Sequence, residues 1–488
     1  MHNVPVRCHS PGGEGLLPAN PRRGAMLFNS TEFLLCFLPL VVAVYYVLPW
    51  RARAAWLALA SYFFYGWWRV DCVGLMLALT AINYAGGLGI ARAKGGGAKR
   101  AWLVFAIVGS LGVLGYFKYV DFLIRTWNGL AVALGTGDRI EPLGVLLPIG
   151  ISFYTFQSMS YPIDIYRGVS RPARRLVDFA CYVSLFPQLI AGPIVRYREI
   201  ADQLAERTHT ADKFARGLVF FVVGLAKKVL LADALAAAAG AAFDHGAVGL
   251  PAAWLGLLAY GFQIYFDFSG YSDMAVGLGL MFGFEFPQNF DSPYRAVGVR
   301  DFWRRWHMSL SRWLRDYLYI PLGGSRQGTV RLCASVLITF FLGGLWHGAH
   351  WTFVLWGIYY AALIGAEHAV GRVRALNGVP VGAKRAATFV LVLLGWVLFR
   401  SATVADAGVL YGGLFGAQGW GALPAAMRSV EFAAVFVLCA AIAWCGRNLW
   451  AWQWRITART ALWVLPLFAA GLYKVLTTDY SPFLYFQF

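Results

Sequence analysis

Two histidines lie in the middle of a long apolar segment. The stretch from Leu332 to Ala366 contains no Asp, Glu, Lys or Arg, and His347 and His350 stand near its centre. An ionisable side chain in a run long enough to cross a bilayer indicates a functional site. The alternative is that each imidazole hydrogen-bonds a neighbouring helix and only stabilises packing. We take His347 as the first candidate for catalysis and His350 as a local polar contact.

The reaction that these histidines could support is limited by what else the sequence contains. A histidine whose pKa is near neutrality suits general-base catalysis on a hydroxyl group, and helix ends or neutral donors can polarise a carbonyl. His347 and His350 could share a metal ion, but Glu367 and His368 lie several turns away, so we expect no metal site. The chain has no nucleophile elbow, no phosphate-binding glycine loop and no HExxH motif. Acyl transfer is the reaction that fits these residues best.

A further histidine lies in a segment with helical amphipathicity, from Asp301 to Tyr317. At 100° per residue, its aromatic and leucine side chains and His307 fall within an arc of about 120°, which predicts one interfacial helix. Because His307 belongs to this arc, we expect it to face the interior. The opposite face either binds an anionic substrate or anchors the helix to lipid phosphates. Its charged residues are Arg304, Arg305, Arg312, Arg315 and Asp316.

Two carboxylates and a tyrosine lie at membrane depth upstream of this helix. Asp267 and Asp273 do not share one helical face unless the intervening Gly270 breaks the helix, as we expect. Carboxylates in this environment must be paired, protonated or exposed to water. One interpretation is that Asp267 and Tyr271 take part in binding a substrate. The other is that the carboxylates pair internally with an arginine, which would be Arg295, Arg300 or Arg304.

The composition indicates that the chain is a membrane protein. Hydrophobic residues make up 59% of the 488 residues and charged residues 14%, whereas soluble domains carry roughly a quarter. The formal charge of +18 is spread over short segments between apolar runs, as in cytoplasmic loops, so no nucleic-acid partner is expected. The seven cysteines form no CxxC pair, which argues against a disulfide framework and a zinc ribbon.

The apolar runs predict an all-α polytopic membrane protein with about ten to twelve transmembrane helices, plus re-entrant or interfacial helices. Residues 55 to 90 are predicted to form a hairpin that turns near Arg69 to Asp71. Residues 1 to 25 are rich in Pro, Gly and Arg and lack the apolar core of a signal peptide, so we interpret them as a disordered extension or a misassigned start. Residues 26 to 488 are then a single membrane domain.

Two motifs resemble the membrane-bound O-acyltransferase family. The first reads WRRWHMSLSRWLRDYLYIPLGG from Trp303 to Gly324, and the second reads GGLWHGA from Gly343 to Ala349. Shorter strings extend the similarity, in order, over residues 26 to 488. Within the family, the chain is similar to the bacterial alginate O-acetyltransferase branch. The supporting strings lie at residues 26–30, 148–157, 186–194 and 485–488.

The resemblance implies a ring of helices around a central funnel, with His347 as the near-invariant histidine at its waist and His307 at the second signature position. It implies no bound cofactor but a cytoplasmic acyl donor, a thioester such as acetyl-CoA, whose acetyl group passes to a hydroxyl. In this branch the acetyl group crosses the bacterial inner membrane to an extracytoplasmic partner protein that modifies a polysaccharide. His347 would then act as general base, while His307 hydrogen-bonds the thioester carbonyl or positions the donor.

Two other classes of protein stay open at this point. A proton-coupled secondary transporter would use buried His and Asp residues as a proton relay. A non-catalytic scaffold of a polysaccharide export complex would not need His347 for chemistry. The polymer also stays open, since alginate, cellulose, peptidoglycan and other glycans are all compatible with the sequence.

Overall fold

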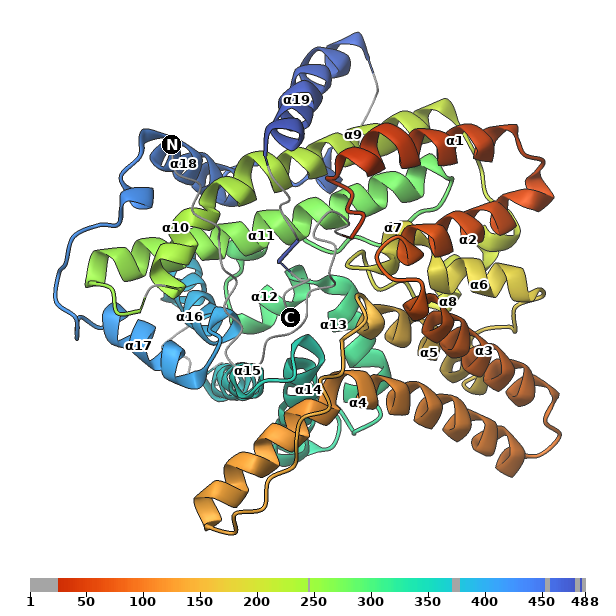
Figure 1. Cartoon of the computed structure of the whole chain (residues 1–488), viewed down its shortest axis with the longest axis horizontal. Helices are drawn as coiled ribbons and strands as arrows, with labels where there is room; N and C mark the ends of the chain where they lie inside the picture. Colours follow the sequence, from red (N-terminus) through yellow and green to blue (C-terminus); the bar gives the residue numbers. More distant parts are fainter. Residues whose placement is uncertain (1–24, 245, 371–377, 453–456, 479–482, 485–488) are drawn as a thin grey trace.

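A computed structural model describes residues 25–244, 246–370, 378–452, 457–478 and 483–484, which fold into helices with no β-strand among them. The predicted all-α class is therefore confirmed. The expectations for residues 1–24 and for the string at 485–488 lie outside the described residues. Helices from both halves of the chain surround a central group (Figure 1). This group consists of α12 (Val299–Arg305), α13 (Met308–Leu314) and α14 (Gly328–His347).

The remaining helices fall into two successive sets. The first set is η1 (Phe33–Phe37), α1 (Leu38–Val47), α2 (Trp50–Gly66), α3 (Asp71–Arg92), α4 (Gly96–Leu134), α5 (Ile151–Tyr166), α6 (Leu176–Ser184), α7 (Phe186–Leu189), α8 (Tyr197–Ala205), α9 (Ala211–Ala226), η2 (Lys227–Ala232), α10 (Asp233–Phe243) and α11 (Leu250–Met281). The second set is η3 (Pro293–Arg295), η4 (Arg315–Tyr319), α15 (Trp351–Val370), α16 (Val381–Arg400), α17 (Val404–Leu414), η6 (Ala425–Met427), α18 (Val430–Trp444), η7 (Leu449–Ala451) and α19 (Ala458–Thr477).

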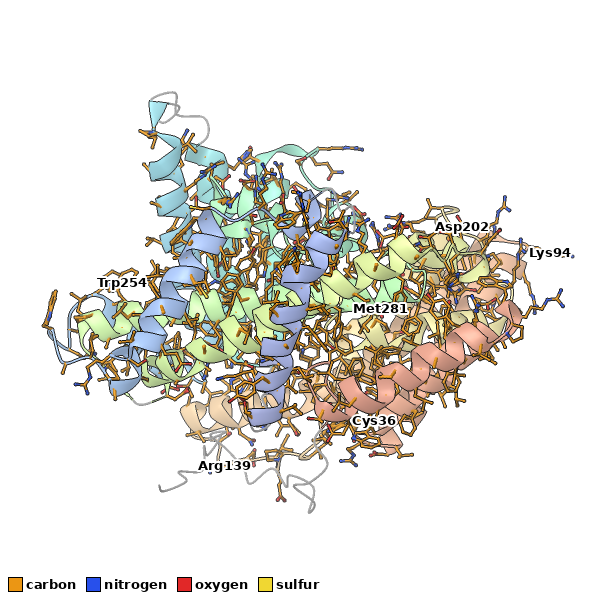
Figure 2. The ribbon with its side chains drawn as sticks, turned by 90° about the horizontal axis from the view of Figure 1, so that it is seen from above. Cys36, Lys94, Arg139, Asp202, Trp254 and Met281 are labelled. Carbon is orange, nitrogen blue, oxygen red and sulfur yellow. The ribbon has the colours of Figure 1, made fainter. Side chains whose placement is uncertain are left out.

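Five of the described helices are long and apolar enough to cross a membrane: α3, α4, α14, α16 and α19. The protein is thus a polytopic membrane protein, and the predicted hairpin of α2 and α3 is confirmed. The count of ten to twelve spans stays a prediction, because some apolar runs form short buried helices such as α6 and α7. Figure 2 places Lys94, just before the 39-residue α4, and Arg139, just beyond it, far apart on the periphery.

The 32-residue helix α11 runs through the protein interior and is not broken at Gly270. A Cβ atom on Gly270 would lie 2.7 Å from the carbonyl oxygen of Gly224 in α9, and one on Gly224 would lie 2.5 Å from that of Gly270. Gly217 and Gly277 make the same reciprocal contact further along the pair. Small residues let two membrane helices approach this closely. The predicted break at Gly270 is therefore wrong, since this glycine serves packing, and α9 runs beside α11 in Figure 1.

The apolar run around His347 divides into two helices, α14 and α15, which pack against each other. A Cβ atom on Gly344 would lie 2.2 Å from the carbonyl oxygen of Phe353, and one on Gly357 would lie 2.3 Å from that of Phe340. The chain between the helices leaves the helical conformation at Gly348, where φ is −158° and ψ is 147°. His347 is consequently the last residue of α14, and its side chain projects from a helix end.

The segment predicted as one interfacial helix from 301 to 317 is divided at Trp306 and His307 into α12 and α13, so that prediction is wrong. His307 adopts the left-handed conformation, with φ 43° and ψ 53°. Such a conformation costs a non-glycine residue roughly 1–2 kcal/mol, so tertiary contacts must hold it. Asn289 provides them: its carbonyl oxygen accepts from the Met308 amide at 2.9 Å, and its Oδ1 accepts from the Ser309 amide at 3.1 Å.

Candidate active site

His347 lies at the C-terminal end of α14, with 6% of its surface exposed. Its imidazole is packed edge-on by two large aromatic rings, those of Trp356 and Phe399, with ring centroids 5.1 Å away in each case. These neighbours come from α15 and α16, so three helices fix the ring. A single imidazole held in an apolar environment can accept or donate a proton at a defined point with little water nearby.

His307 is 1% exposed and lies in the turn between α12 and α13, outside the five candidate spans. Its ring contacts Phe268 of α11 at 4.7 Å and Trp346 of α14 at 5.9 Å between centroids. Burial lowers the pKa of His307 to about 3, so the imidazole is neutral at pH 7. A neutral imidazole still carries one N–H donor. The predicted inward orientation of His307 is confirmed.

The two histidines are neighbours in the folded chain. Their ring centroids are 6.4 Å apart, and the planes are inclined by 56°. The fold therefore brings the two imidazoles, which lie on different segments of the sequence, into one region of the interior.

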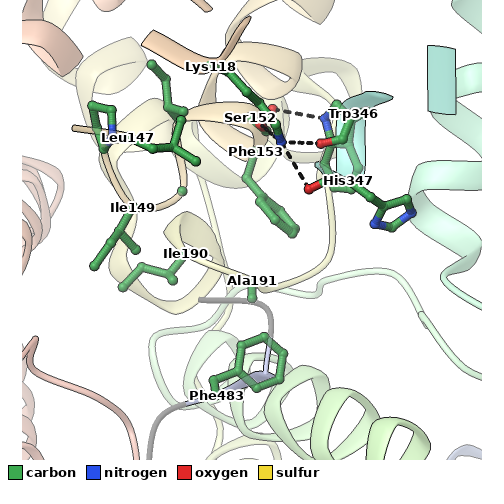
Figure 3. Close-up of a pocket in the computed structure, with 13 residues that line it drawn as sticks. Lys118, Leu147, Ile149, Ser152, Phe153, Ile190, Ala191, Trp346, His347 and Phe483 are labelled. Atoms are coloured by element: carbon green, nitrogen blue, oxygen red, sulfur yellow. Dashed lines mark hydrogen bonds between the residues drawn. The ribbon is translucent and has the colours of Figure 1, made fainter. Parts of the chain in front are cut away.

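His347 lines two cavities. The first, of about 190 Å³, is bounded by the 147–153 segment, Ile190, Ala191, Trp346 and Phe483, and Lys118 also reaches it (Figure 3). In that view the imidazole of His347 is directed away from Leu147 and Ile149. The second cavity, of about 270 Å³, is bounded by α12, α13, α14 and α15. His347 is thus at the wall of both cavities, and the funnel itself stays a prediction.

The second cavity is apolar with a cationic rim. Among the arginines predicted for substrate binding, Arg304 and Arg315 line this cavity, and Arg300 joins them. Arg305 instead pairs with Asp301 at 3.0 Å and with Asp291 at 3.5 Å. Of the described residues in the predicted site, those outside both cavity walls are His307, Arg305, Arg312, Asp316, Asp267 and Tyr271.

Asp316 is the centre of an ion-pair cluster. Its carboxylate lies 2.5 Å from Arg196, 3.2 Å from Arg198 and 2.7 Å from Arg315. Burial raises the pKa of Asp316, but the hydrogen bonds and charges of Arg315 and Arg196 outweigh this effect and hold the pKa below its ordinary value. The carboxylate therefore stays ionised and ties η4 to the start of α8. In this position it orients Arg315, which lines the second cavity.

Asp267 is a buried ion-pair partner. Its Oδ1 lies 2.7 Å from Lys228 Nζ, and its Oδ2 accepts from the Leu484 amide at 3.0 Å. Asp273 pairs in the same way with Lys227 at 2.6 Å. The prediction that both carboxylates pair with cations inside the protein is confirmed. The predicted arginine partners are wrong, because the π-helix η2 brings two lysines against α11. Asp267 thereby fixes the segment that carries Phe483 into the first cavity.

Tyr271 lies in a three-ring stack. Its ring centroid is 4.6 Å from that of Phe28 and 4.7 Å from that of Phe483, with interplanar angles of 16° and 29°. The stack joins the beginning and the end of the described chain to α11. Donor binding by Tyr271 stays a prediction, and the same is true of Asp267.

Lys118 and Ser152 are two polar residues of the first cavity that the sequence reasoning did not select. The Nζ atom of Lys118 lies 3.2 Å from Ser152 Oγ and donates to the carbonyl oxygens of Trp346 and His347. A lysine in the apolar run of α4 was a usable signal, since ionisable residues inside spans are commonly functional. Its carbonyl partners on α14, however, lie more than two hundred positions away in sequence, so only the fold reveals these contacts.

Comparison with known proteins shows which family the chain belongs to. A model of the membrane-bound O-acyltransferase family matches residues 173–404. The probable alginate O-acetylase AlgI of Azotobacter vinelandii is 43% identical over 505 residues, which covers 95% of this chain and 100% of that protein. The protein of the same name from Pseudomonas aeruginosa is 47% identical over 397 residues, covering 81% of this chain and 76% of that one. The peptidoglycan O-acetyltransferase of Helicobacter pylori is 36% identical over 81% of this chain and 80% of its own. Because these similarities extend over most of the chain, and the family match includes both His307 and His347, this protein belongs to the membrane-bound O-acyltransferase family.

Proposed function

We propose that this O-acyltransferase takes acetyl groups from a cytoplasmic thioester such as acetyl-CoA and passes them to a hydroxyl acceptor on the other side of the bacterial inner membrane. The observation that supports it is the position of His347 at the wall of two separate cavities. A donor in one cavity and an acceptor in the other would meet at this residue. The transporter and scaffold alternatives are less favoured, since the family is one of O-acyltransferases.

In the proposed reaction His347 is the general base. Its imidazole takes the proton of the acceptor hydroxyl as the oxygen attacks the thioester carbon. A new C–O bond forms, the C–S bond breaks, and the departing thiolate recovers the proton from the imidazolium. His307, neutral and 6.4 Å away between centroids, donates a hydrogen bond to the carbonyl oxygen as negative charge develops there.

The second cavity is the proposed donor site. Arg300, Arg304 and Arg315 lie at its wall, and guanidinium groups bind phosphates through charge-assisted hydrogen bonds. Its apolar interior would hold the thioester arm of the donor. Arg305, which pairs with Asp301 and Asp291, and the partly buried Arg312 lie outside this wall and have no part in the proposed donor site.

The proposed final acceptor is an exopolysaccharide of the alginate type, because two of the relatives compared above are probable alginate O-acetylases. An extracytoplasmic partner protein would complete the transfer. The first cavity, at about 190 Å³, is the smaller of the two and could not enclose a polymer segment. It would admit one hydroxyl-bearing group at a time.

The O-acetyl content of purified envelope polysaccharides tests this function. We would delete the gene, restore it in parallel, and quantify the acetate released by alkali from the uronate exopolysaccharide and from peptidoglycan. We expect the deletion to remove acetate from the exopolysaccharide alone, and the restored gene to return it. Loss from peptidoglycan alone would reject the proposed acceptor and favour the second candidate, for which the Helicobacter pylori relative is the observation. Unchanged acetate in every polymer would reject the function.

A further inference from the structure

Lys118 lies in the middle of α4, a helix that otherwise meets the criteria for a membrane span. A cation in such a helix is costly unless its donors are bonded. The three N–H groups of an ammonium are the only donors a lysine has. Here the acceptors are the carbonyl oxygens of Trp346 and His347 and the hydroxyl of Ser152, as the dashed lines in Figure 3 show.

The contacts of Lys118 complete the end of α14. A helix leaves its last four carbonyl groups without intrahelical partners. In α14 the Gly344 carbonyl accepts from the Gly348 amide at 3.2 Å, and the Leu345 carbonyl accepts from the hydroxyl of Tyr119 at 2.8 Å. Lys118 supplies the other two bonds. A cation at this end also interacts favourably with the partial negative charge of the helix C-terminus.

The same contacts connect Lys118 with both histidines. His347 is the residue whose carbonyl Lys118 binds, so the backbone that carries the imidazole is held directly. The ring of Trp346 lies against His307 at 5.9 Å, and its Nε1 donates to the Ser152 carbonyl at 3.4 Å. A shift of the end of α14 would therefore displace His347 and the surface on which His307 rests. Lys118 also lies at the wall of the first cavity beside His347.

We propose that Lys118 is a positioning residue for acyl transfer: its ammonium fixes the terminal turn of α14 and thereby sets the place of the His347 imidazole relative to His307. The assignment rests on the proposed function, since it presumes that His347 is the base. A misplacement of about 1 Å in an active site can lower the rate by two orders of magnitude. The donor site lies on the other cavity, so donor binding is expected to stay unchanged.

Full-length variants in proteoliposomes, supplied with acetyl-CoA and the extracytoplasmic partner, test this role through kcat, KM for acetyl-CoA and thermal unfolding. Lys118→Met should lower kcat by about 100-fold with an unchanged KM. Lys118→Arg, which keeps the charge and several donors, should recover most of that loss. Tyr119→Phe removes one bond from the same helix end and should change kcat little. Lys99→Met makes the same exchange at an exposed position of α4 and should match the wild type.

The outcomes separate this proposal from the proposed function. His347→Ala is measured beside the other variants. If His347→Ala is inactive while Lys118→Met keeps the wild-type kcat, the role of Lys118 is rejected and the function stands. The role of Lys118 would also be rejected if Lys118→Met and Tyr119→Phe lost kcat equally and in proportion to their losses of thermal stability. Such a result would mean that both side chains only stabilise the end of α14. If His347→Ala is fully active, both proposals fail.

Discussion

At the scale of residues, the two histidines differ in how the backbone presents them. His347 is the last residue of a regular helix, whereas His307 occupies a left-handed turn that Asn289 holds. A helix end is a stiff support, and a strained turn persists only when its surroundings over-determine it. Both supports hold a ring in a fixed position, as the proposed proton transfer requires.

Replacement of His347 by alanine is expected to lower the rate of acyl transfer by two to four orders of magnitude, because a base removed from a buried site has no substitute. The protein should still insert and purify. His350→Ala is the matched control, since His350 lies three positions on at an exposed place and should keep the wild-type rate. The measurement is the release of free CoA in proteoliposomes that contain the acceptor system. A wild-type rate in His347→Ala would refute its assignment as base.

For His307, alanine and glycine variants separate the ring from the backbone. Both remove the imidazole, but glycine tolerates φ 43° and alanine does not. We expect His307→Gly to unfold at a higher temperature than His307→Ala, by the equivalent of about 1 kcal/mol. Both should lose the same fraction of activity, less than His347→Ala loses, with a raised KM for acetyl-CoA. If His307→Gly were both more stable and more active than His307→Ala, the imidazole ring would have no direct role in the reaction.

At the scale of elements, glycines decide where the helices lie. The pairs Gly224–Gly270 and Gly217–Gly277 bring α9 and α11 into backbone contact, and this places η2 so that Lys228 reaches Asp267. Gly344 brings α15 against the end of α14. The same residue type thus fixes both the helix that carries His347 and the helix whose Phe268 supports His307.

Gly270→Ala is expected to destabilise the protein by about 1–3 kcal/mol, because the added methyl group would overlap the Gly224 carbonyl in a region that cannot expand. Gly112→Ala is the control: it lies in α4 with open space around it and should be neutral. Thermal unfolding in one detergent compares the two. Equal unfolding temperatures of Gly270→Ala and the wild type would refute the close backbone contact between α9 and α11.

Sequence patterns predicted the type of structure better than the points where helices end. The hairpin of α2 and α3 and the inward face of His307 followed from periodicity. The break at His307 did not, because its cause is Asn289, which lies in a different segment. Gly270 was misinterpreted for a related reason: a glycine permits both a helix break and a close helix contact, and only the partner helix distinguishes them. The contacts of Lys118 could not be predicted from its own helix, because its carbonyl acceptors are on α14.

At the scale of the whole molecule, the two ends of the described chain meet in the interior. Phe28 and Phe483 enclose Tyr271, and Asp267 binds the backbone beside Phe483. The first cavity is therefore bounded in part by Phe483, from the last described segment, while the second is bounded by α12, α13, η4, α14 and α15. His347 is at the wall of both cavities, which is what the proposed transfer between a donor and an acceptor needs.

The protein is expected to need an extracytoplasmic partner protein to acetylate a polymer. The cavity proposed for the acceptor is small, and connections such as residues 135–150 are too short to form a polysaccharide cleft. Liposomes that contain the purified protein, with labelled acetyl-CoA inside and uronate polymer outside, provide the measurement. Label should reach the polymer only after the partner protein is added outside, and His347→Ala should prevent it. Rapid labelling of the polymer without any added protein would show instead that this chain is the complete enzyme.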